Sequence, residues 1–326
     1  MAKINKQVIE KYLIYLVLLV IVVVFTVLEP KFISFDNIIN LLRQVSVIGL
    51  LAMGVALVII SKGIDLSSGF VVAVSAVVGA SLAQKPDAPN KFFENIPQLN
   101  LLLIVAICIL VGIFIGLVNG LLIAYTGIPA FIATLGTMVV FRAFAMLYTG
   151  GQPISFLRPD YEFLGKGYLF TILPIPVVIF LVITFITWVL VNYTTFGKGI
   201  YAIGGNIHAS TVSGIKVNKI LALDYMYAGA LAALGGVLLS ARVGGGQPSF
   251  GTGYELDAIA AATIGGVSHS GGIGTVGGVL AGVIILGVIN NGLNLLGVQA
   301  EWQSVAKGAI IVISVIIDTK KYNKNQ

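Results

Sequence analysis

The sequence predicts an all-α polytopic membrane protein with ten transmembrane helices. Hydrophobic residues make up 58% of the 326 residues and charged residues only 10%, whereas a soluble domain carries about 25% charged residues. The mean hydropathy is +1.02. The apolar residues also gather in runs, most of which approach the roughly 17–25 residues that a spanning helix needs. Residues 1–326 are therefore expected to form a single transmembrane domain.

Ten apolar runs account for most of the chain. The first run is too long for the core of a signal peptide, and no small-residue cleavage site follows it before Glu29. The eighth run is short for a span, and the topology after residue 243 would invert if it did not cross. The expected spans are residues 12–28, 40–60, 66–83, 101–125, 129–148, 174–192, 221–243, 256–267, 273–293 and 302–317.

Positive charges orient the predicted spans. With the N-terminus inside and ten crossings, ten lysines fall on the inner side and five Lys or Arg residues on the outer side, so both termini are expected in the cytoplasm. The pI near 9.3 follows from basic residues scattered over short loops, which disfavours nucleic acid as a partner. The inner residues are Lys3, Lys6, Lys11, Lys62, Lys198, Lys216, Lys219, Lys320, Lys321 and Lys324, and the outer ones are Lys31, Lys85, Lys91, Arg158 and Lys166.

Three loops between the spans are long. Residues 84–100 and 149–173 are expected outside, and 193–220 inside as the largest cytoplasmic segment. In the inner loop, Asn206 follows a glycine pair and can cap a short helix over 207–213, which Gly214 would end. A short helix at this place is either an interfacial element or a docking element.

Glycines and short sequence echoes give clues to packing. Val-Asn-Gly-Leu at 118–121 resembles Asn-Asn-Gly-Leu at 290–293, and the third and eighth spans both begin beside acidic residues. These positions lead to the hypothesis of an inverted repeat that pairs spans 2–5 with spans 7–10. Glycines spaced by four share a helix face, and tight packing within one subunit is expected for both such runs. The runs are Gly112, Gly116 and Gly120, and Gly274, Gly278 and Gly282.

The sequence disfavours an enzyme. It holds no G-x-x-x-x-G-K-[ST] phosphate-binding loop, so the chain is not expected to hydrolyse ATP, and it holds no H-E-x-x-H zinc motif. Cys108 is the single cysteine, and His208 and His269 lie far apart in the sequence. No metal ligand set is expected.

Charged residues in or near the spans are the first candidates for function, because a charge at membrane depth costs at least about 2.5–3.5 kcal/mol. Asp65 and Asp257 stand just before apolar helices, and N-capping is the favoured interpretation for both. An ion pair of Asp257 with Arg142 or Arg242 is the alternative. Glu255 is not at a natural capping position, so a gating or pairing role is expected. The full set is Asp65, Arg142, Asp224, Glu255, Asp257 and Lys307.

Neutral polar residues in the spans suit a hydroxylated, uncharged cargo, although any single one can instead bond across helices. These residues are Asn119, Thr134, Thr137, Asn290, Asn291 and Asn294. Candidates for a translocation path are Asp65, Ser67, Asn119, Thr134, Glu255, Asp257, Asn290, Asn291 and Asn294.

Several motifs from about residue 30 to the C-terminus resemble the permease subunits of bacterial ABC importers for ribose, galactose and related monosaccharides. The string Gly253-Tyr-Glu-Leu-Asp-Ala-Ile-Ala-Ala261 is the most specific of them. The others are Ser61-Lys-Gly-Ile-Asp-Leu-Ser67, Tyr201-Ala-Ile-Gly-Gly-Asn206, Val212-Ser-Gly-Ile215, Gly265-Gly-Val-Ser268 and Asn291-Gly-Leu293.

The resemblance implies a permease in the plasma (inner) membrane, with a second permease subunit, most simply a homodimer. It also implies an ABC ATPase subunit inside, which binds ATP-Mg, and a sugar-binding protein outside; the chain itself would bind no cofactor. The loop 193–220 matches the family's cytoplasmic coupling loop, which contacts the ATPase. Its coupling residues would be Gly205, Asn206, His208, Ala209, Ser213 and Gly214. The family's Glu-Ala-Ala after the asparagine is replaced here by Ile-His-Ala at 207–209.

The motifs leave the cargo open between ribose and galactose or methyl-galactoside. An ABC permease for another small polar solute, such as a nucleoside or an autoinducer-type sugar, is the first alternative. A self-sufficient secondary transporter fits less well, because the sequence has no strongly acidic cluster for ion coupling.

Overall fold

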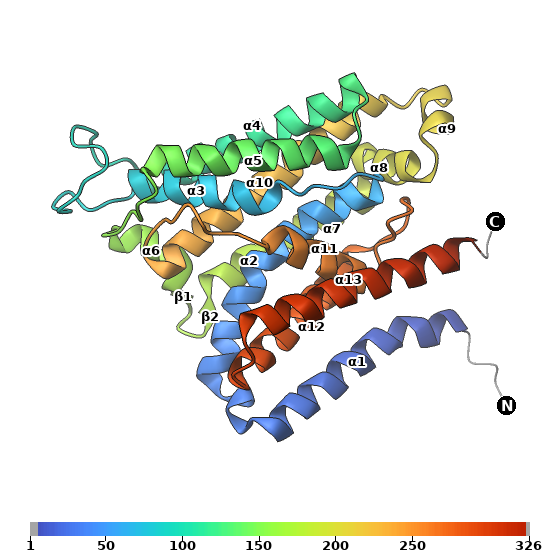
Figure 1. Ribbon diagram of the computed structural model, residues 1–326, viewed down its shortest axis with the longest axis horizontal. Coiled ribbons are helices and arrows are strands. Elements are labelled where there is room, and N and C mark those ends of the chain that lie inside the picture. The colour runs from blue at the N-terminus through green and yellow to red at the C-terminus, as the bar shows by residue number, and fades with distance from the viewer. Residues whose placement is uncertain (1–5, 324–326) are drawn as a thin grey trace.

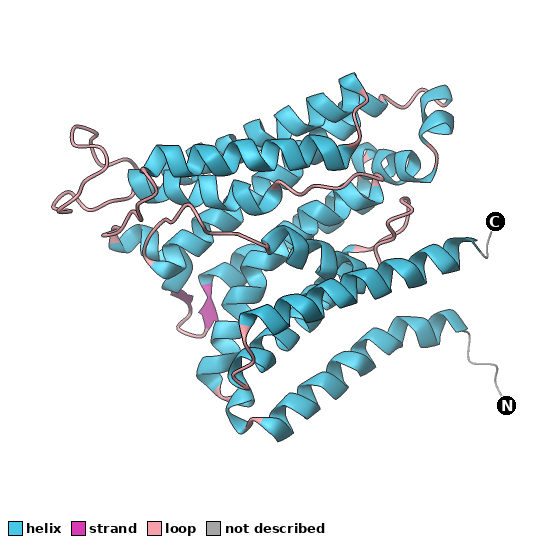
Figure 2. Cartoon of the chain, viewed as in Figure 1, coloured by secondary structure: helices cyan, strands magenta, loops and turns pink. Residues whose placement is uncertain are grey.

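The computed structural model describes residues 6–323, which form helices almost throughout and one two-stranded hairpin (Figures 1 and 2). The elements in chain order are α1 (Lys6–Leu28), the 3₁₀ helix η1 (Pro30–Ile33), α2 (Phe35–Ile60), α3 (Ser68–Leu82), α4 (Leu101–Thr126), α5 (Ala130–Thr149), α6 (Pro159–Lys166), β1 (Tyr168–Leu169), β2 (Leu173–Pro174), α7 (Ile175–Tyr193), α8 (Thr195–Gly205), α9 (Ile207–Val212), α10 (Val217–Val243), α11 (Tyr254–Ile264), α12 (Val276–Leu295) and α13 (Ala300–Asn323).

A helix stands at each of the ten predicted spans, which confirms an all-α membrane fold. Among the residues that the structure describes in full, six helices are long and apolar enough to cross a bilayer: α2, α4, α5, α7, α10 and α12. In contrast, α3 has 15 residues and α11 has 11, too few to cross alone. The count of ten spans therefore stays a prediction.

Two long helices form the centre of the molecule. α10 packs against α4, α3 and α2, and α2 packs in turn against α11, α12 and α7. The glycines of α4 make the closest of these contacts, because a Cβ on Gly116 would collide with the backbone of Tyr225 and one on Gly120 would meet the backbone of Ala222. The expectation that this glycine face packs within the subunit is confirmed. The Gly278 and Gly282 face does the same against α11.

The outer surfaces of α4, α5 and α7 are apolar. Phe114, Phe144, Leu147 and Phe185 are all more than half exposed. A soluble monomer rarely exposes so wide an apolar surface, whereas lipid tails solvate it. These three helices therefore present the lipid-facing side of the protein.

The predicted loop 149–173 contains two elements that the apolar pattern did not reveal. α6 begins with Pro159, holds Asp160 and Glu162 in its first turn, and has Lys166 in its last turn, an order that favours a helix. The strands β1 and β2 then pair antiparallel, with Tyr168 opposite Pro174. Eight helical residues and a two-residue pair are too short for periodicity to detect.

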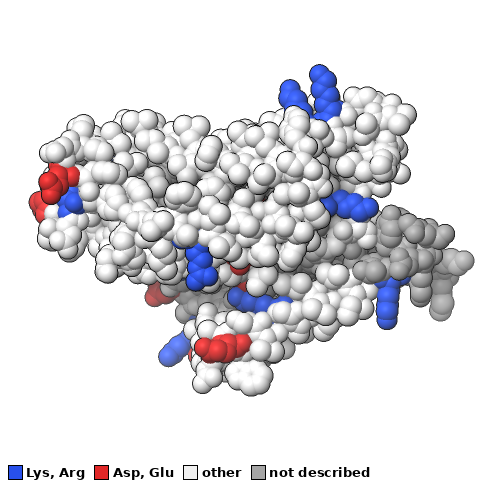
Figure 3. All heavy atoms as spheres, turned by 45° about the horizontal axis from the view of Figure 1, so that its top comes forward, with Lys and Arg blue, Asp and Glu red and all other residues white. Residues whose placement is uncertain are grey.

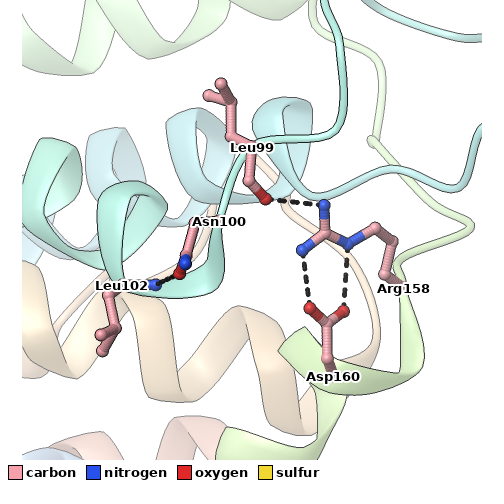
Figure 4. A network of polar contacts seen from close by, with 5 residues as sticks. All are labelled: Leu99, Asn100, Leu102, Arg158 and Asp160. Carbon is pink, nitrogen blue, oxygen red and sulfur yellow. Dashed lines mark hydrogen bonds and ion pairs between the residues drawn. The ribbon is translucent and has the colours of Figure 1, made fainter.

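Arg158 ties this segment to the neighbouring loop, 84–100. Its Nε and Nη2 donate to the two carboxylate oxygens of Asp160 at 3.0 and 2.6 Å, and Nη1 donates to the Leu99 carbonyl at 2.9 Å (Figure 4). Asn100 beside it caps α4 by accepting from the Leu102 amide at 2.9 Å. Two long loops are thus joined at the start of α4.

Candidate translocation site and coupling element

The short helices α3 and α11 begin in the interior of the molecule, and their N-terminal ends face each other there. After α2 ends, residues 61–67 run back toward the middle and lead into α3; after α10 ends, residues 244–253 do the same from the opposite end and lead into α11 (Figure 1). A Cβ on Gly69 would collide with the Gly251 carbonyl and the Glu255 carboxylate. The N-terminal ends of α3 and α11 are therefore in contact, and we call residues 65–69 and 251–257 the central junction.

Acidic side chains accompany both helix starts. Asp65, Glu255 and Asp257 are 3%, 8% and 4% exposed. A helix N-terminus carries roughly half a positive charge, which favours a nearby carboxylate. Two such ends meeting in an apolar interior account for three carboxylates at one place.

A chain of hydrogen bonds runs from Asp65 across three helices. Asp65 Oδ1 accepts from the backbone N–H and the hydroxyl of Ser67, at 2.8 and 2.7 Å. The Ser67 hydroxyl accepts from Asn119 Nδ2 at 2.7 Å, and Asn119 Oδ1 accepts from the Thr137 hydroxyl at 2.6 Å. The structure thus brings together three predicted site residues, and it adds Thr137 from α5.

Thr134 lies beside this chain of bonds. Its hydroxyl donates to the carbonyls of Ala130 and Ile64, at 2.8 and 3.2 Å, and the Tyr225 hydroxyl also donates to the Ile64 carbonyl at 3.4 Å. The Asp65 segment is therefore held by α5 and α10 as well as by α4. Each of these helices contributes a neutral donor to the backbone or the hydroxyl beside the carboxylate.

The capping prediction holds for Asp65 in part and is wrong for Asp257. Asp65 does accept a backbone N–H, that of Ser67 just before α3. Asp257 lies inside the first turn of α11, whose N-cap is Gly253, and its own N–H already bonds the Gly253 carbonyl.

The ion pair expected for Asp257 exists with a different partner. Lys307 Nζ of α13 lies 2.7 Å from Asp257 Oδ1, so the pair joins α11 to α13. Arg142 instead lies over the Phe70 ring, 5.5 Å from its centroid. Glu255 Oε2 has no hydrogen-bond partner among residues 6–323, and none of the ion pairs recorded for these residues includes Glu255.

The three asparagines of α12 lie elsewhere. Asn291 exchanges two hydrogen bonds with Asn37 in the first turn of α2, at 2.8 and 2.9 Å, and Asn294 accepts from Gln303 of α13 at 2.8 Å. Asn290 is 3% exposed and its Oδ1 lacks a hydrogen-bond partner among residues 6–323. Because residues 61–67 leave α2 at its other end, these asparagines do not share a site with Asp65.

Asp224 is one of the charged candidates from the sequence, but the predicted translocation path does not include it. Asp224 on α10 is fully buried and accepts from the Ser61 hydroxyl at 2.7 Å, which ties α10 to the end of α2. A carboxylate inside an apolar run was the available signal. Thr137 stands among the neutral polar residues of the predicted spans but outside the predicted path, and Asn37 gives no comparable signal because a lone polar residue at a helix end is common.

The predicted helix in loop 193–220 is confirmed as α9. Asn206 caps it by accepting from the Ala209 amide at 2.9 Å, and Gly214 beyond its end has φ +81°. His208, Ala209 and Ser213 are exposed. This element can meet a partner along its open side.

α8, which precedes α9, was not predicted. Gly197, Gly199 and Gly204 lower its helix propensity, yet they permit close packing. A Cβ on Gly204 would collide with the Ile60 carbonyl and the Gly272 amide. The Gly272 N–H also donates to the Ile60 carbonyl at 2.8 Å. α8 therefore rests on the residue that precedes segment 61–67 and on the loop that follows α11.

Comparisons with known proteins identify the family of the chain. Residues 37–315 match the family described as branched-chain amino acid transport system / permease component. The galactose/methyl galactoside import permease protein of Escherichia coli K12 is 42% identical over 337 residues, covering 100% of both chains. The ribose import permease protein of Bacillus subtilis 168 is 44% identical over 298 residues, covering 91% of this chain and 88% of that protein. No solved structure gives a significant match.

Proposed function

The chain belongs to the branched-chain amino acid transport system permease component family, and on this premise we propose that it is the membrane-spanning permease subunit of an ABC importer for a monosaccharide. The identity to galactoside and ribose import permeases over nearly the whole chain carries the proposal. A buried network of neutral donors around Asp65 supports it, because hydroxyl, amide and carboxylate groups bind sugar hydroxyls. The cargo is galactose, methyl galactoside or ribose.

The translocation path passes the central junction in this proposal. The non-helical segments 61–67 and 244–253 connect helices through turns and irregular backbone, so they can shift without unwinding a long helix. Short or interrupted helices at membrane depth are typical of transport sites. Asp65, Ser67, Asn119 and Glu255 are the residues that such a path would expose first.

ATP hydrolysis belongs to a partner subunit, which docks on α9 through His208, Ala209 and Ser213. The contacts of α8 support a mechanical link from there to the interior. Movement of α9 would displace Gly204, and with it Ile60 and Gly272. Ile60 leads into the Asp65 segment and Gly272 lies beyond the end of α11, so both sides of the central junction would respond. No cofactor is assigned to the chain itself, and this stays a prediction.

We also infer that helices α2–α5 and α10–α13 are inverted repeats. The packing supports this: α3 contacts α4 and α5 as α11 contacts α12 and α13, and α10 packs on α3 and α4 as α2 packs on α11 and α12. The short helix is second in each set. The contact of α2 with α11 and the contact of α10 with α3 are then equivalent contacts between the two repeats.

The orientation proposed has α8 and α9 in the cytoplasm and loop 84–100 outside. The charge distribution supports it. In the view of Figure 3, acidic side chains gather at the end that carries loop 84–100, while the end that carries α8 and α9 displays basic ones. A binding protein would deliver the sugar at the first end. The second permease subunit is a copy of this chain in the simplest assembly.

Reconstitution tests the function. The permease, its ATPase and its binding protein in liposomes should take up labelled galactose, methyl galactoside or ribose only with internal ATP. Permease alone should neither hydrolyse ATP nor take up sugar. Uptake by permease alone, driven by an ion gradient, would instead make it a secondary transporter. Failure with all three sugars but success with a nucleoside would keep the ABC assignment and change the cargo.

A further inference from the structure

A basic groove lies between α8 and the start of α10, away from the central junction. It has a volume of about 550 Å³. Lys198 projects from α8, Lys216 is the N-cap residue of α10, and Lys219 lies in its first turn. All three are exposed, and the groove contains no Asp or Glu. No ion pair recorded for residues 6–323 includes any of these lysines.

The groove has an apolar floor. Phe196 and Ile220 line it, and Gly199 lets α8 approach closely because a Cβ there would collide with the Ile220 side chain. Leu223 closes one side and is 39% exposed, so the floor continues onto the outer surface of α10. A ligand here would contact lysine ammonium groups and hydrocarbon at once.

Aromatic residues place the groove at the depth of lipid headgroups. Trp188 and Tyr193, at the end of α7, pack edge to face with ring centroids 5.2 Å apart and are 41% and 68% exposed. Exposed Trp and Tyr gather where a membrane protein meets the headgroup layer. Thr195 starts α8 two residues later and lines the groove. The lysines are therefore at the level of lipid phosphates.

We propose that this groove binds an anionic phospholipid, with its phosphate between Lys198, Lys216 and Lys219 and an acyl chain along Phe196 and Leu223. The positive charge without a compensating carboxylate favours an anionic headgroup, and the apolar floor that continues to the exposed Leu223 side chain favours a lipid over a soluble phosphate. An acidic protein partner fits less well, because it would leave the exposed Leu223 side uncovered. This inference does not depend on the cargo or on which side of the membrane the groove faces.

The test uses purified full-length chain in detergent with a photoactivatable phosphatidylglycerol that carries its reactive group on an acyl chain. Labelled peptides should map to residues 215–223 and to α8, and phosphatidylcholine with the same acyl group should label them far less. Inorganic phosphate should not compete at equal concentration. Replacing each lysine by Gln should lower the preference for phosphatidylglycerol by roughly fivefold per lysine.

Two triple lysine variants serve as controls for the Gln substitutions. The triple variant Lys198→Arg, Lys216→Arg, Lys219→Arg should retain the preference, and so should Lys31→Gln, Lys85→Gln, Lys91→Gln, which removes three lysines from other loops. Size-exclusion profiles identify any misfolded variant, and the Arg triple then carries the test. Equal labelling by both lipids, or an unchanged preference in the Gln triple, overturns the proposal. Loss of ATPase co-purification with unchanged lipid labelling would assign the groove to the protein partner.

Discussion

Asp257 and Lys307 show how a single charge can fix two helices of this protein. The carboxylate is only 6% exposed and the ammonium 24%. A buried charge that loses its partner is strongly destabilising, even where the pair itself adds little net stability. The pair therefore specifies how α13 sits on α11 more than it strengthens the fold.

Breaking the pair from one side tests this point. Asp257→Asn should lower the free energy of unfolding by up to about 3 kcal/mol, because it strands Lys307 in a largely apolar site. The double variant Asp257→Asn, Lys307→Met should recover most of the loss, as read from thermal unfolding in detergent. The exposed pair of Glu162 and Lys166 is the control, and Glu162→Gln should cost less than about 1 kcal/mol. Equal losses in the single and double variants would contradict a coupling between the two residues.

The two hydrogen bonds from Arg158 to the Asp160 carboxylate should weaken at acidic pH. The guanidinium of Arg158 holds the pKa of the Asp160 carboxyl below its ordinary value of 3.8. A carboxyl with a lowered pKa contributes stability above its unfolded pKa and loses it as the pH falls through the folded one. The difference in melting temperature between wild type and Asp160→Asn should therefore be small and positive at neutral pH and shrink as the pH falls below the ordinary value of 3.8 toward the lowered pKa of Asp160. The effect is small because Asp160 is 48% exposed. A melting-temperature difference that grows on acidification would contradict a stabilising contact between Arg158 and the Asp160 carboxylate.

The sequence predicts which residues belong to the site better than it predicts which residues contact each other. Asp65, Ser67 and Asn119 were chosen as polar residues in apolar surroundings, and the structure joins them. The partner of Asp257 was missed because Lys307 lies far along the chain, and spacing does not give the angle at which α13 crosses α11. The asparagines of α12 were grouped with Asn119 on residue type alone, although helix direction separates them.

Among the helices, α8 and α9 depend on glycines for two different reasons. Gly204 needs space, since a Cβ would strike the Ile60 carbonyl, whereas Gly205 beside it has no neighbour within 4 Å of such an atom. Gly214 has free space but a φ of +81°, which β-branched residues resist. Neighbouring substitutions can therefore separate packing from backbone conformation.

Matched glycine variants test the coupling role of α8 and α9. Gly204→Ala should uncouple ATP hydrolysis from uptake or prevent assembly, while Gly205→Ala should behave as wild type. Gly214→Val should impair coupling, and Gly214→Asn should be tolerated because asparagine accepts the left-handed conformation. Ala209→Arg should block docking of the ATPase. ATPase co-purification, sugar-stimulated hydrolysis and uptake are measured together, and wild-type values in Ala209→Arg and Gly214→Val would exclude α9 as the coupling element.

The sequence predicts elements well wherever burial in lipid dominates. Each apolar run became a helix because an unpaired backbone in hydrocarbon is prohibitive. α6, α8 and the hairpin were missed because they lie where water is available, and local signals there compete with glycine and proline. The third run, 66–83, predicts a helix only slightly longer than α3 (Ser68–Leu82), and the eighth run, 256–267, already indicates that α11 (Tyr254–Ile264) is short.

The predicted transmembrane topology of the whole molecule can be tested by cysteine labelling. Single cysteines in a Cys108→Ala background should react with an impermeant reagent from outside at positions 93 and 160, and only after permeabilisation at position 208. Cys108 is fully buried, so its removal should leave the native labelling pattern unchanged. The termini, at 1–5 and 324–326, lie outside the described residues, and their predicted cytoplasmic location is tested by the same method. Outside labelling at 208 would refute the ten-span topology and the docking role together.

The meeting of α3 and α11 also has a consequence for how the protein is made. With 11 residues and two carboxylates in its first turn, α11 cannot partition into lipid by itself as it leaves the translocon. It can settle only against other helices, first α2 and α3, which were synthesised long before, and its Asp257 stays uncompensated until α13 brings Lys307. Biogenesis must then end with a late step that closes the interior from the C-terminus. A chain truncated after α12 would reach the membrane with an open, charged core, the kind of defect that membrane proteases recognise.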